Sequence, residues 1–154
     1  LLRAQQVGLS LDLVPLSLVT MNIVYAAVSA PAGKWSDRED PRTVLSAGLL
    51  VLLLADVVLA LFDDVTGALA GAALWGLHMG LTQGLLSAMV SKAAPGELRG
   101  TAFGVYNLVN GVALLLASVI AGTFWSAFGA GATFMSGAVL AVLSLASLVA
   151  LLRD

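Results

Sequence analysis

The sequence predicts an all-α membrane protein, a polytopic bundle of five transmembrane helices. Hydrophobic residues make up 60% of its 154 residues, charged residues make up 10%, and the mean hydropathy is +1.01. A water-soluble domain of this length needs more polar surface around its core, whereas lipid accepts Leu, Val and Ala facing outward. Most charged residues also lie between long apolar runs rather than inside them. Composition and charge pattern therefore favour helices that cross a bilayer.

The first three expected spans cover about 9–30, 44–62 and 67–91. Each is long enough, at about 1.5 Å per residue, to cross a hydrocarbon core of about 30 Å. Pro15 and Pro31 lie near the two ends of the first span. A membrane helix tolerates proline where neighbouring groups satisfy the freed carbonyl. Asp63 and Asp64 close the second span.

The last two expected spans cover about 101–125 and 132–152. The segment Ala94-Pro95-Gly96-Glu97 precedes the fourth span, and Gly129-Ala130-Gly131 separates the fourth from the fifth. Clusters of glycine and proline are typical of turns. We therefore expect hydrophilic loops at 31–43 and 92–100, and a short apolar turn before the last span.

Basic residues predict which ends of the spans face the cytoplasm, because cytoplasmic loops are enriched in Lys and Arg. Those that follow the first, third and fifth spans all fall on one side: Lys34, Arg38, Arg42, Lys92, Arg99 and Arg153. Asp63 and Asp64 lie on the other side, where Arg3 is the one basic exception. We expect a multi-pass protein of the cell (inner) membrane with its C-terminus in the cytoplasm. Residues 1–8 lack the order of a signal peptide, and we expect them to be the tail of a longer chain.

The densest charge lies in the loop after the first span. Its spacing is Gly33-x-x-x-Asp37-Arg38-x-Asp40-Pro41-Arg42. This resembles the loop signature of the major facilitator superfamily, G-x-x-x-D-R/K-x-G-R/K-R/K, which joins the second and third helices of each six-helix half. Asp40 and Pro41 replace the usual glycine and the first basic residue of its second part.

A second resemblance lies before the fourth span. The segment Pro95-Gly96-Glu97-Leu98-Arg99-Gly100-Thr101-Ala102-Phe103-Gly104 is similar to the P-x-x-x-R-G-x-A-x-G junction between the tenth and eleventh helices of many members. Four spans follow the charged loop here, as four helices follow that loop in the C-terminal half of the family. The resemblance therefore implies the eighth to twelfth helices of a transporter of this superfamily, an MFS-type C-terminal domain, and a partner half that this chain does not supply.

Polar residues predict which spans face a cavity. The second and fifth spans consist mostly of Leu, Val, Ala and small residues, which suit lipid, whereas the other three carry amides, tyrosines and the single histidine. Unpaired polar groups cost several kcal/mol in hydrocarbon, so we expect them to face a bundle interior or a watery cavity. The family resemblance implies the same division, because its eighth, tenth and eleventh helices line the central cavity.

On the third span, helical spacing separates two faces. A smooth stripe of Gly76, Gly80 and Gly84, joined by Ser87, favours close contact with another helix. The opposite face carries His78, Thr82 and, beside them, Trp75. His78 has an unperturbed pKa near 6.5, which suits a proton relay or an anionic ligand. The alternative is a neutral histidine that is hydrogen-bonded to a neighbouring helix.

The first and fourth spans carry further candidates for the substrate or proton pathway. They are Asn22 and Tyr25, which share a face with Ser29, and Tyr106 and Asn110, which share a face with Phe103. Amides and phenols can hydrogen-bond a solute. The alternative for each is a hydrogen bond between helices. An adjoining stripe on the fourth span is expected to pack against a helix: Gly100, Gly104, Asn107, Gly111 and Ser118.

Two polar residues are assigned other roles. Gln83 lies nearer the glycine stripe than His78 does, so we interpret it as structural first. Asp56 interrupts the second span about 9 Å from its outer end, where it is either hydrated or protonated. Because a peripheral helix is a poor place for a coupling acid, a functional role is the less favoured reading of Asp56.

The charged loop is expected to act as a conformational lock. Gly33 would let it pass close to a neighbouring helix, and Asp37 could meet a positive helix N-terminus. Arg38 and Arg42 could pair with nearby acids. The family resemblance implies a lock between the two halves that stabilises the outward-open state, to which we add Arg99. The alternative is a solvated loop that only sets orientation.

These patterns predict a secondary active transporter that moves a small solute by alternating access, coupled to protons, with efflux favoured over nutrient uptake. There is no nucleotide-binding loop and no cysteine, and we expect no cofactor, metal or nucleic acid. A membrane enzyme is disfavoured, because one histidine allows neither a metal set nor a Ser/His/Asp set. A non-transporting membrane fragment or scaffold remains an alternative. The expected partners are the solute, protons, the bilayer and an N-terminal half.

Overall fold

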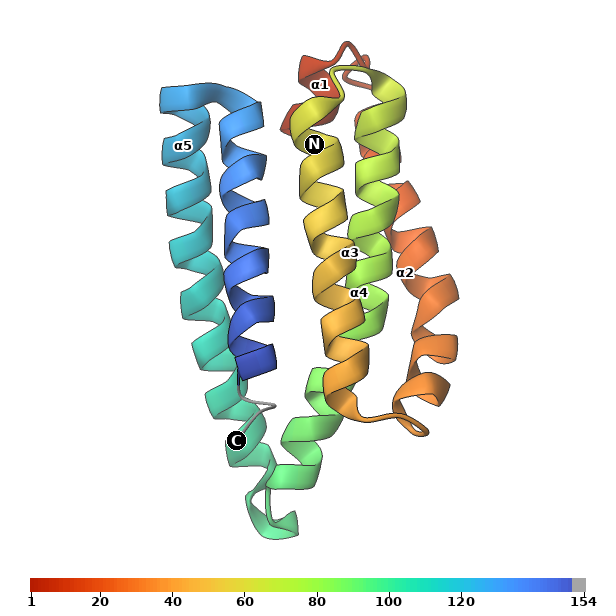
Figure 1. Cartoon of the computed structure of the whole chain (residues 1–154), viewed down its shortest axis with the longest axis vertical. Coiled ribbons are helices and arrows are strands. Elements are labelled where there is room, and N and C mark those ends of the chain that lie inside the picture. The colour runs from red at the N-terminus through yellow and green to blue at the C-terminus, as the bar shows by residue number, and fades with distance from the viewer. Residues whose placement is uncertain (151–154) are drawn as a thin grey trace.

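A computed structural model describes residues 1–150, and every element in this part of the chain is helical (Figure 1). The elements in order are α1 (Leu2–Gln6), α2 (Pro15–Ser36), α3 (Pro41–Leu61), α4 (Val65–Ala93), the short 3-10 turn η1 (Gly96–Leu98) and α5 (Arg99–Ala150). The described residues contain no strand. The predicted all-α fold class is confirmed.

α5 consists of two helical parts that meet at Gly129. This glycine has φ 82° and ψ −178°, a conformation that is not helical. Figure 1 shows the ribbon folding back on itself between the two parts, which we call the first part (99–128) and the second part (130–150) of α5. Only glycine adopts this region of backbone conformation readily, so one residue suffices for a turn that the sequence analysis placed over three.

Several helices extend beyond the predicted spans. α2 continues through Pro31 to Ser36, with the amide of Asp37 still bonded to the Gly33 carbonyl at 3.0 Å. The prediction of a loop over 31–36 is therefore wrong, because a helix that leaves the hydrocarbon can continue into water. The actual connection to α3 covers 37–40.

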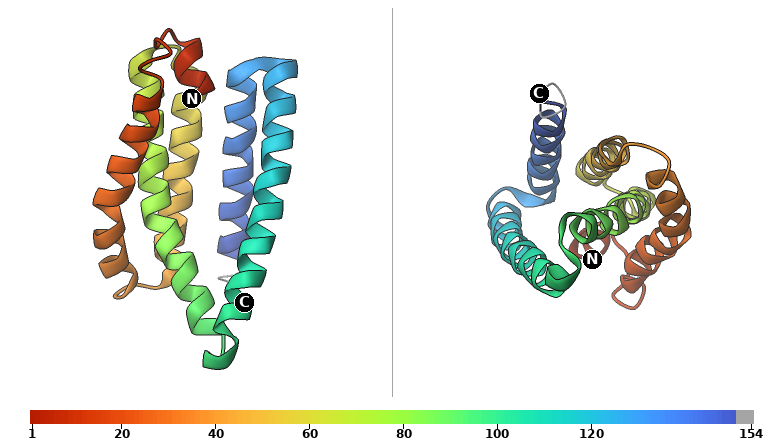
Figure 2. Two further views of the ribbon diagram at one scale, coloured as in Figure 1. Left: turned by 180° about the vertical axis from the view of Figure 1, so that it is seen from behind. Right: turned by 90° about the horizontal axis from the view of Figure 1, so that it is seen from below.

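α4 lies in the middle of the bundle and connects its parts. It packs against α2 on one side and α3 on another, and α3 in turn packs against α5 (Figures 1 and 2). The far end of α4 leads away from α2 toward the start of α5 in both figures. The first part of α5 therefore lies beside the second part of α5. Most large apolar side chains of the first part are exposed.

Two groups of buried residues hold the helices together. The first joins α2, α3 and α4, and consists of Ala32, Val44, Leu81 and Leu85. The second joins α3 to the second part of α5 through small residues, including Ala55, Ala138 and Ala141. Small side chains permit the close helix approach on which membrane bundles depend. α3 is thus packed on two sides, while Leu50, Leu54 and Leu61 remain exposed on it.

Three helices within residues 1–150 combine the length and hydropathy that a membrane crossing needs. They are α2, with mean hydropathy 1.4, α3, with 2.7, and the stretch Gly96–Ala150, with 2.0, which contains both parts of α5. α4 is not among them, since its glycines and polar residues lower its hydropathy. A multi-pass helical membrane protein is supported, and the count of five spans stays a prediction.

The connections alternate between the two ends of the bundle. In Figure 1 the links at 37–40 and 94–98 lie at the lower end, and the link at 62–64 and the turn between the two parts of α5 lie at the upper end. The basic connections therefore share one end, as the charge pattern predicted. Which end faces the cytoplasm stays a prediction. Arg153 and the end of the fifth expected span, 151–152, lie outside the described residues.

Candidate functional site

His78 and Thr82 of α4 lie against α3. His78 Nδ1 lies 2.8 Å from the carbonyl oxygen of Gly48 on α3. Because a carbonyl can only accept, Nδ1 carries the proton and donates the hydrogen bond, and Nε2 of the neutral ring carries no proton. Thr82 is 4% exposed, its hydroxyl donates to the His78 carbonyl at 2.9 Å, and its methyl group fills the space above Gly48. His78 thus forms the interhelical bond that the sequence analysis named as an alternative.

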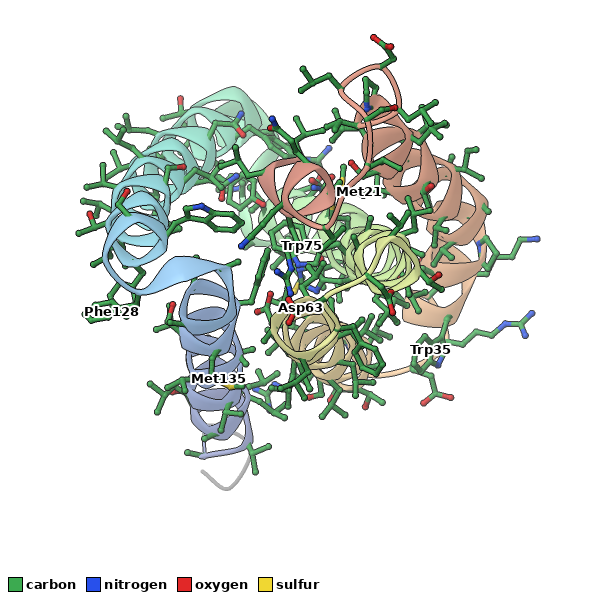
Figure 3. The ribbon with its side chains drawn as sticks, turned by 90° about the horizontal axis from the view of Figure 1, so that it is seen from above. Met21, Trp35, Asp63, Trp75, Phe128 and Met135 are labelled. Carbon is green, nitrogen blue, oxygen red and sulfur yellow. The ribbon has the colours of Figure 1, made fainter. Side chains whose placement is uncertain are left out.

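Asp56 lies where three helices meet. This residue of α3 is 4% exposed, and its Oδ1 accepts a hydrogen bond from Trp75 Nε1 of α4 at 3.4 Å. A Cβ added to Gly137, in the second part of α5, would lie 2.6 Å from Asp56 Oδ2. Trp75 itself is near the centre of the bundle seen from above (Figure 3). Of the two predicted states of Asp56, hydrated or protonated, burial of the residue beneath α5 disfavours the hydrated one.

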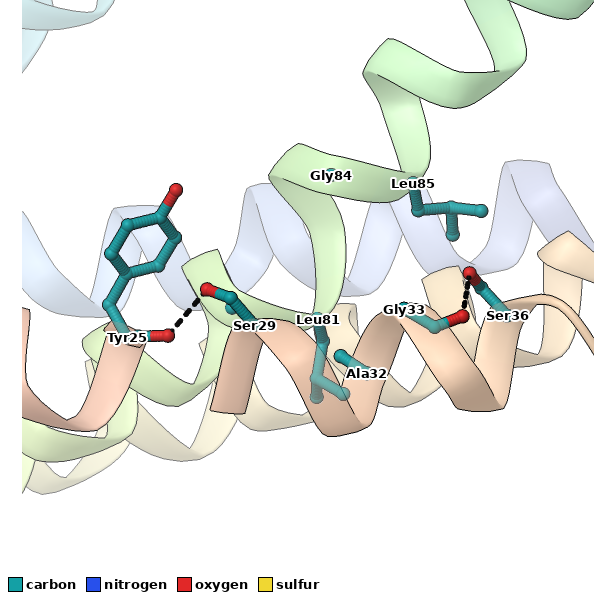
Figure 4. A pocket seen from close by; sticks show the side chains of 9 residues that line it. Tyr25, Ser29, Ala32, Gly33, Ser36, Leu81, Gly84 and Leu85 are labelled. Atoms are coloured by element: carbon teal, nitrogen blue, oxygen red, sulfur yellow. Dashed lines mark hydrogen bonds between the residues drawn. The ribbon is translucent and has the colours of Figure 1, made fainter. Parts of the chain in front are cut away.

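The glycine stripe of α4 lies partly against α2. A Cβ on Gly76 would collide with the backbone carbonyl of Met21, and one on Gly80 would lie 3.0 Å from the Val28 side chain. A Cβ added to Gly84 would meet nothing within 4 Å, because α4 leaves α2 near this point (Figure 4). Gln83 is exposed. The first two glycines therefore allow close packing of α4 on α2, and the third does not.

A small pocket lies between α2 and α4 where they separate (Figure 4). Its volume is about 70 Å³, well below the 300–1,000 Å³ of typical ligand sites. The hydroxyls of Ser29 and Ser36 on its wall donate to carbonyls of their own helix, at 2.6 Å to Tyr25 and 2.9 Å to Gly33. The pocket therefore has room for a few water molecules and not for an organic solute.

The candidate residues of α2 and α5 remain apart. Asn22 on α2 is exposed and donates to the Leu18 carbonyl of its own helix at 2.7 Å, while Asn110 on α5 is also exposed. Tyr25 and Tyr106 are half-buried. Seen from below, α4 lies between α2 and the first part of α5 (Figure 2). The glycine stripe on α5 has no packing partner in the described structure. A Cβ added to any of its glycines would meet nothing within 4 Å: Gly100, Gly104 and Gly111.

The charged connection is arranged differently from the expectation. Asp40, rather than Asp37, caps the N-terminus of α3, with its Oδ1 accepting from the Arg42 amide at 2.8 Å. Gly33 lies in the last turn of α2, and a Cβ added to it would meet nothing within 4 Å, so no close helix contact requires a glycine there. Arg38, Arg42 and Arg99 are exposed. The connection forms no ion pair within residues 1–150.

Arg3 has a contact that sequence reasoning missed. It is 5% exposed, and its guanidinium donates to the carbonyls of Leu59 at 3.0 Å and Phe62 at 3.1 Å and to Asp63 Oδ1 at 2.7 Å. The last carbonyls of a helix have no partner within it, and the five donors of arginine suit them. The sequence did contain a signal for this contact, because Arg3 is the one basic residue on the side that carries Asp63 and Asp64. The pairing of Arg3 with Asp63 explains that exception.

The sequence matches the Major Facilitator Superfamily over residues 2–154. It is 33% identical over 150 residues to an uncharacterized MFS-type transporter of Methanocaldococcus jannaschii, covering 94% of this chain and 37% of the relative. It is 30% identical over 138 residues to an uncharacterized MFS-type transporter of Salmonella typhimurium, covering 90% of this chain and 36% of the relative. The chain therefore spans little more than a third of either relative. No solved structure matches it. The match over nearly the whole chain shows that this protein belongs to the Major Facilitator Superfamily.

Proposed function

We propose that this chain is the eighth to twelfth helices of a secondary active transporter that moves a small solute by alternating access. The transporter is coupled to protons, and efflux is favoured over nutrient uptake. An N-terminal half supplies the other wall of the cavity. The family match over residues 2–154 carries this proposal, because the family consists of transporters. A non-transporting membrane fragment is the competing possibility.

The exposed amides add support from physical chemistry. Asn22 on α2 and Asn110 on α5 are exposed on helices that are otherwise apolar. An amide in contact with hydrocarbon costs about 2–7 kcal/mol when it lacks a partner, although Asn22 recovers part of this cost from its own helix. A water-filled cavity or a second helical bundle would remove the cost. A transporter that works by alternating access has both a water-filled cavity and a second helical bundle.

The test is transport by the complete protein in sealed vesicles. Vesicles that contain it are expected to move an amphiphilic probe only when a pH gradient is imposed, and an uncoupler of the gradient should abolish the movement. Vesicles with the same lipid and no protein give the background. Movement equal to that background for every solute tested, with and without the gradient, would favour the non-transporting fragment.

His78 is expected to contribute to proton coupling. In the complete transporter, His78→Ala should lower pH-dependent transport several-fold, because it removes the ring that can take a second proton at Nε2. His78→Gln is the matched control, since its amide can still donate to the Gly48 carbonyl but cannot be protonated. If Gln restores the wild-type pH profile, the ring serves the interhelical bond alone.

Asp37 is expected to act in the lock between the two halves. Asp37→Asn should shift the transporter toward opening at the charged end, seen as faster labelling of a cysteine placed inside the cavity from that side. Asp40→Asn removes the same charge three residues away, and asparagine caps a helix as well as aspartate does, so α3 is preserved. Equal labelling rates for wild type and Asp37→Asn would mean that the connection only sets orientation.

A further inference from the structure

The side chain of Asp56 is a buried acid whose hydrogen-bonding environment is very sparse. It is 4% exposed on α3, and the single hydrogen bond to it within residues 1–150 comes from the indole of Trp75 at 3.4 Å. Gly137 of the second part of α5 lies beside the other oxygen, since a Cβ added to it would be 2.6 Å from Oδ2. A buried carboxylate that stays ionised normally has a cation or several donors.

The elements around Asp56 offer no compensating charge. From α1, Arg3 directs its donors to the carbonyls of Leu59 and Phe62 and to Asp63. From α4, His78 donates to the Gly48 carbonyl. The second part of α5, residues 130–150, contains no titratable residue. No ion pair within 4 Å reaches Asp56 in the described structure.

We propose that Asp56 is a proton-binding site of the transporter, holding a proton while the second part of α5 covers it. A neutral carboxyl group avoids the cost of an unpaired charge away from water. The Trp75 N–H remains a suitable donor to the carbonyl oxygen of the neutral group. The inference rests on the proposed transport function for its purpose, although proton binding itself can be measured without transport.

The chemistry of the site selects a proton over a metal cation. Hard cations such as Ca²⁺ and Mg²⁺ collect several oxygen ligands. Asp56 provides one carboxyl group, and its neighbour Trp75 directs an N–H donor at it, which repels a cation. No group of three metal-binding side chains lies together within residues 1–150.

Release of the proton from Asp56 requires the second part of α5 to move away. Trp75 bonds to Asp56 on one side and is 39% exposed on the other, so its ring connects the buried acid to the surface of the bundle. When the second part of α5 separates from α3, water reaches the carboxyl group. Its O–H bond then breaks, the proton passes to water, and the carboxylate remains solvated. Return of α5 favours the reverse reaction.

Trp75 provides a direct optical test in the purified complete protein. Trp35→Phe and Trp125→Phe remove the other tryptophans of this chain, and any in the rest of the protein are replaced likewise. Fluorescence of Trp75 is then followed as pH is varied, because ionisation of a carboxyl group in contact with the indole changes its emission. A transition that depends on Asp56 is expected. It should vanish in Asp56→Asn, which imitates the protonated acid, and persist in Asp56→Glu.

Transport of a probe, measured on the same variants, distinguishes the two proposals. Asp56→Asn should lose the response to an imposed pH gradient, while Asp12→Asn, the same change at an exposed aspartate, should retain it. If the protein transports nothing but the transition depends on Asp56, the proton site stands and the transport proposal fails. A transition unchanged in Asp56→Asn overturns the proton site. A change in Trp75 fluorescence on adding sodium at constant pH, in place of the pH transition, also overturns the proton site.

Discussion

Gly76→Ala is expected to destabilise the bundle by about 1–3 kcal/mol, in the range of overpacked cores. The added methyl group would collide with the backbone carbonyl of Met21 on α2. A side chain can change rotamer to relieve such a clash, but a carbonyl inside a helix cannot. The two helices must therefore separate and lose contacts along their length. Unfolding of the purified protein by a denaturing detergent, followed by circular dichroism, measures the loss.

Gly84→Ala is the matched control on the same helix and in the same stripe. Nothing lies within 4 Å of its added Cβ. Alanine is favoured over glycine in a helix by about 1 kcal/mol, so this variant should be as stable as wild type or more so. If both variants lose the same stability, close contact between α2 and α4 at Gly76 is not the cause.

Gly129→Ala is expected to cost about 1–3 kcal/mol through backbone strain rather than through packing. No atom lies within 4 Å of the added Cβ, but φ is 82° and ψ is −178° at this residue, a region that alanine adopts only with strain. The second part of α5 packs on α3 only because the chain reverses here. Detergent unfolding and protease cleavage at the turn should both report the change.

The control for this turn is Gly122→Ala, seven residues earlier in the helical first part of α5. It also has open space around it, but its backbone is helical, so alanine should stabilise it slightly. Equal stability of Gly129→Ala and Gly122→Ala would show that the turn can adopt an ordinary helical or extended backbone.

Family and fold class could be predicted from the residues alone. Apolar runs and glycine-rich breaks indicate membrane helices because each pattern lies within one short segment of the chain. The loop around Asp37 and the junction around Arg99 indicate the family because their residues have specific spacings. The exact ends of helices were less predictable. The charges after Pro31 predict a loop, but the helix continues to Ser36 because water tolerates a charged helical turn as well as a charged loop.

The partners of individual side chains depended on distant parts of the chain. His78 and Thr82 were assigned to a cavity because helical spacing shows which residues share a face, but not which helix covers that face. Asp56 was assigned to a peripheral helix because nothing in its own segment indicated Gly137, 81 positions later. Arg3 bonds to residues 56 to 60 positions away.

By itself, the sequence determined that this chain enters lipid as helices and belongs to one superfamily, since hydropathy and short motifs are properties of neighbouring residues. The tertiary structure alone decided that α4 packs between α2 and α3, that the Gly48 carbonyl accepts a hydrogen bond from His78, and that α5 covers Asp56. The physical reason is that burial and hydrogen bonding are set where helices meet, and each meeting brings together residues that are far apart in the chain.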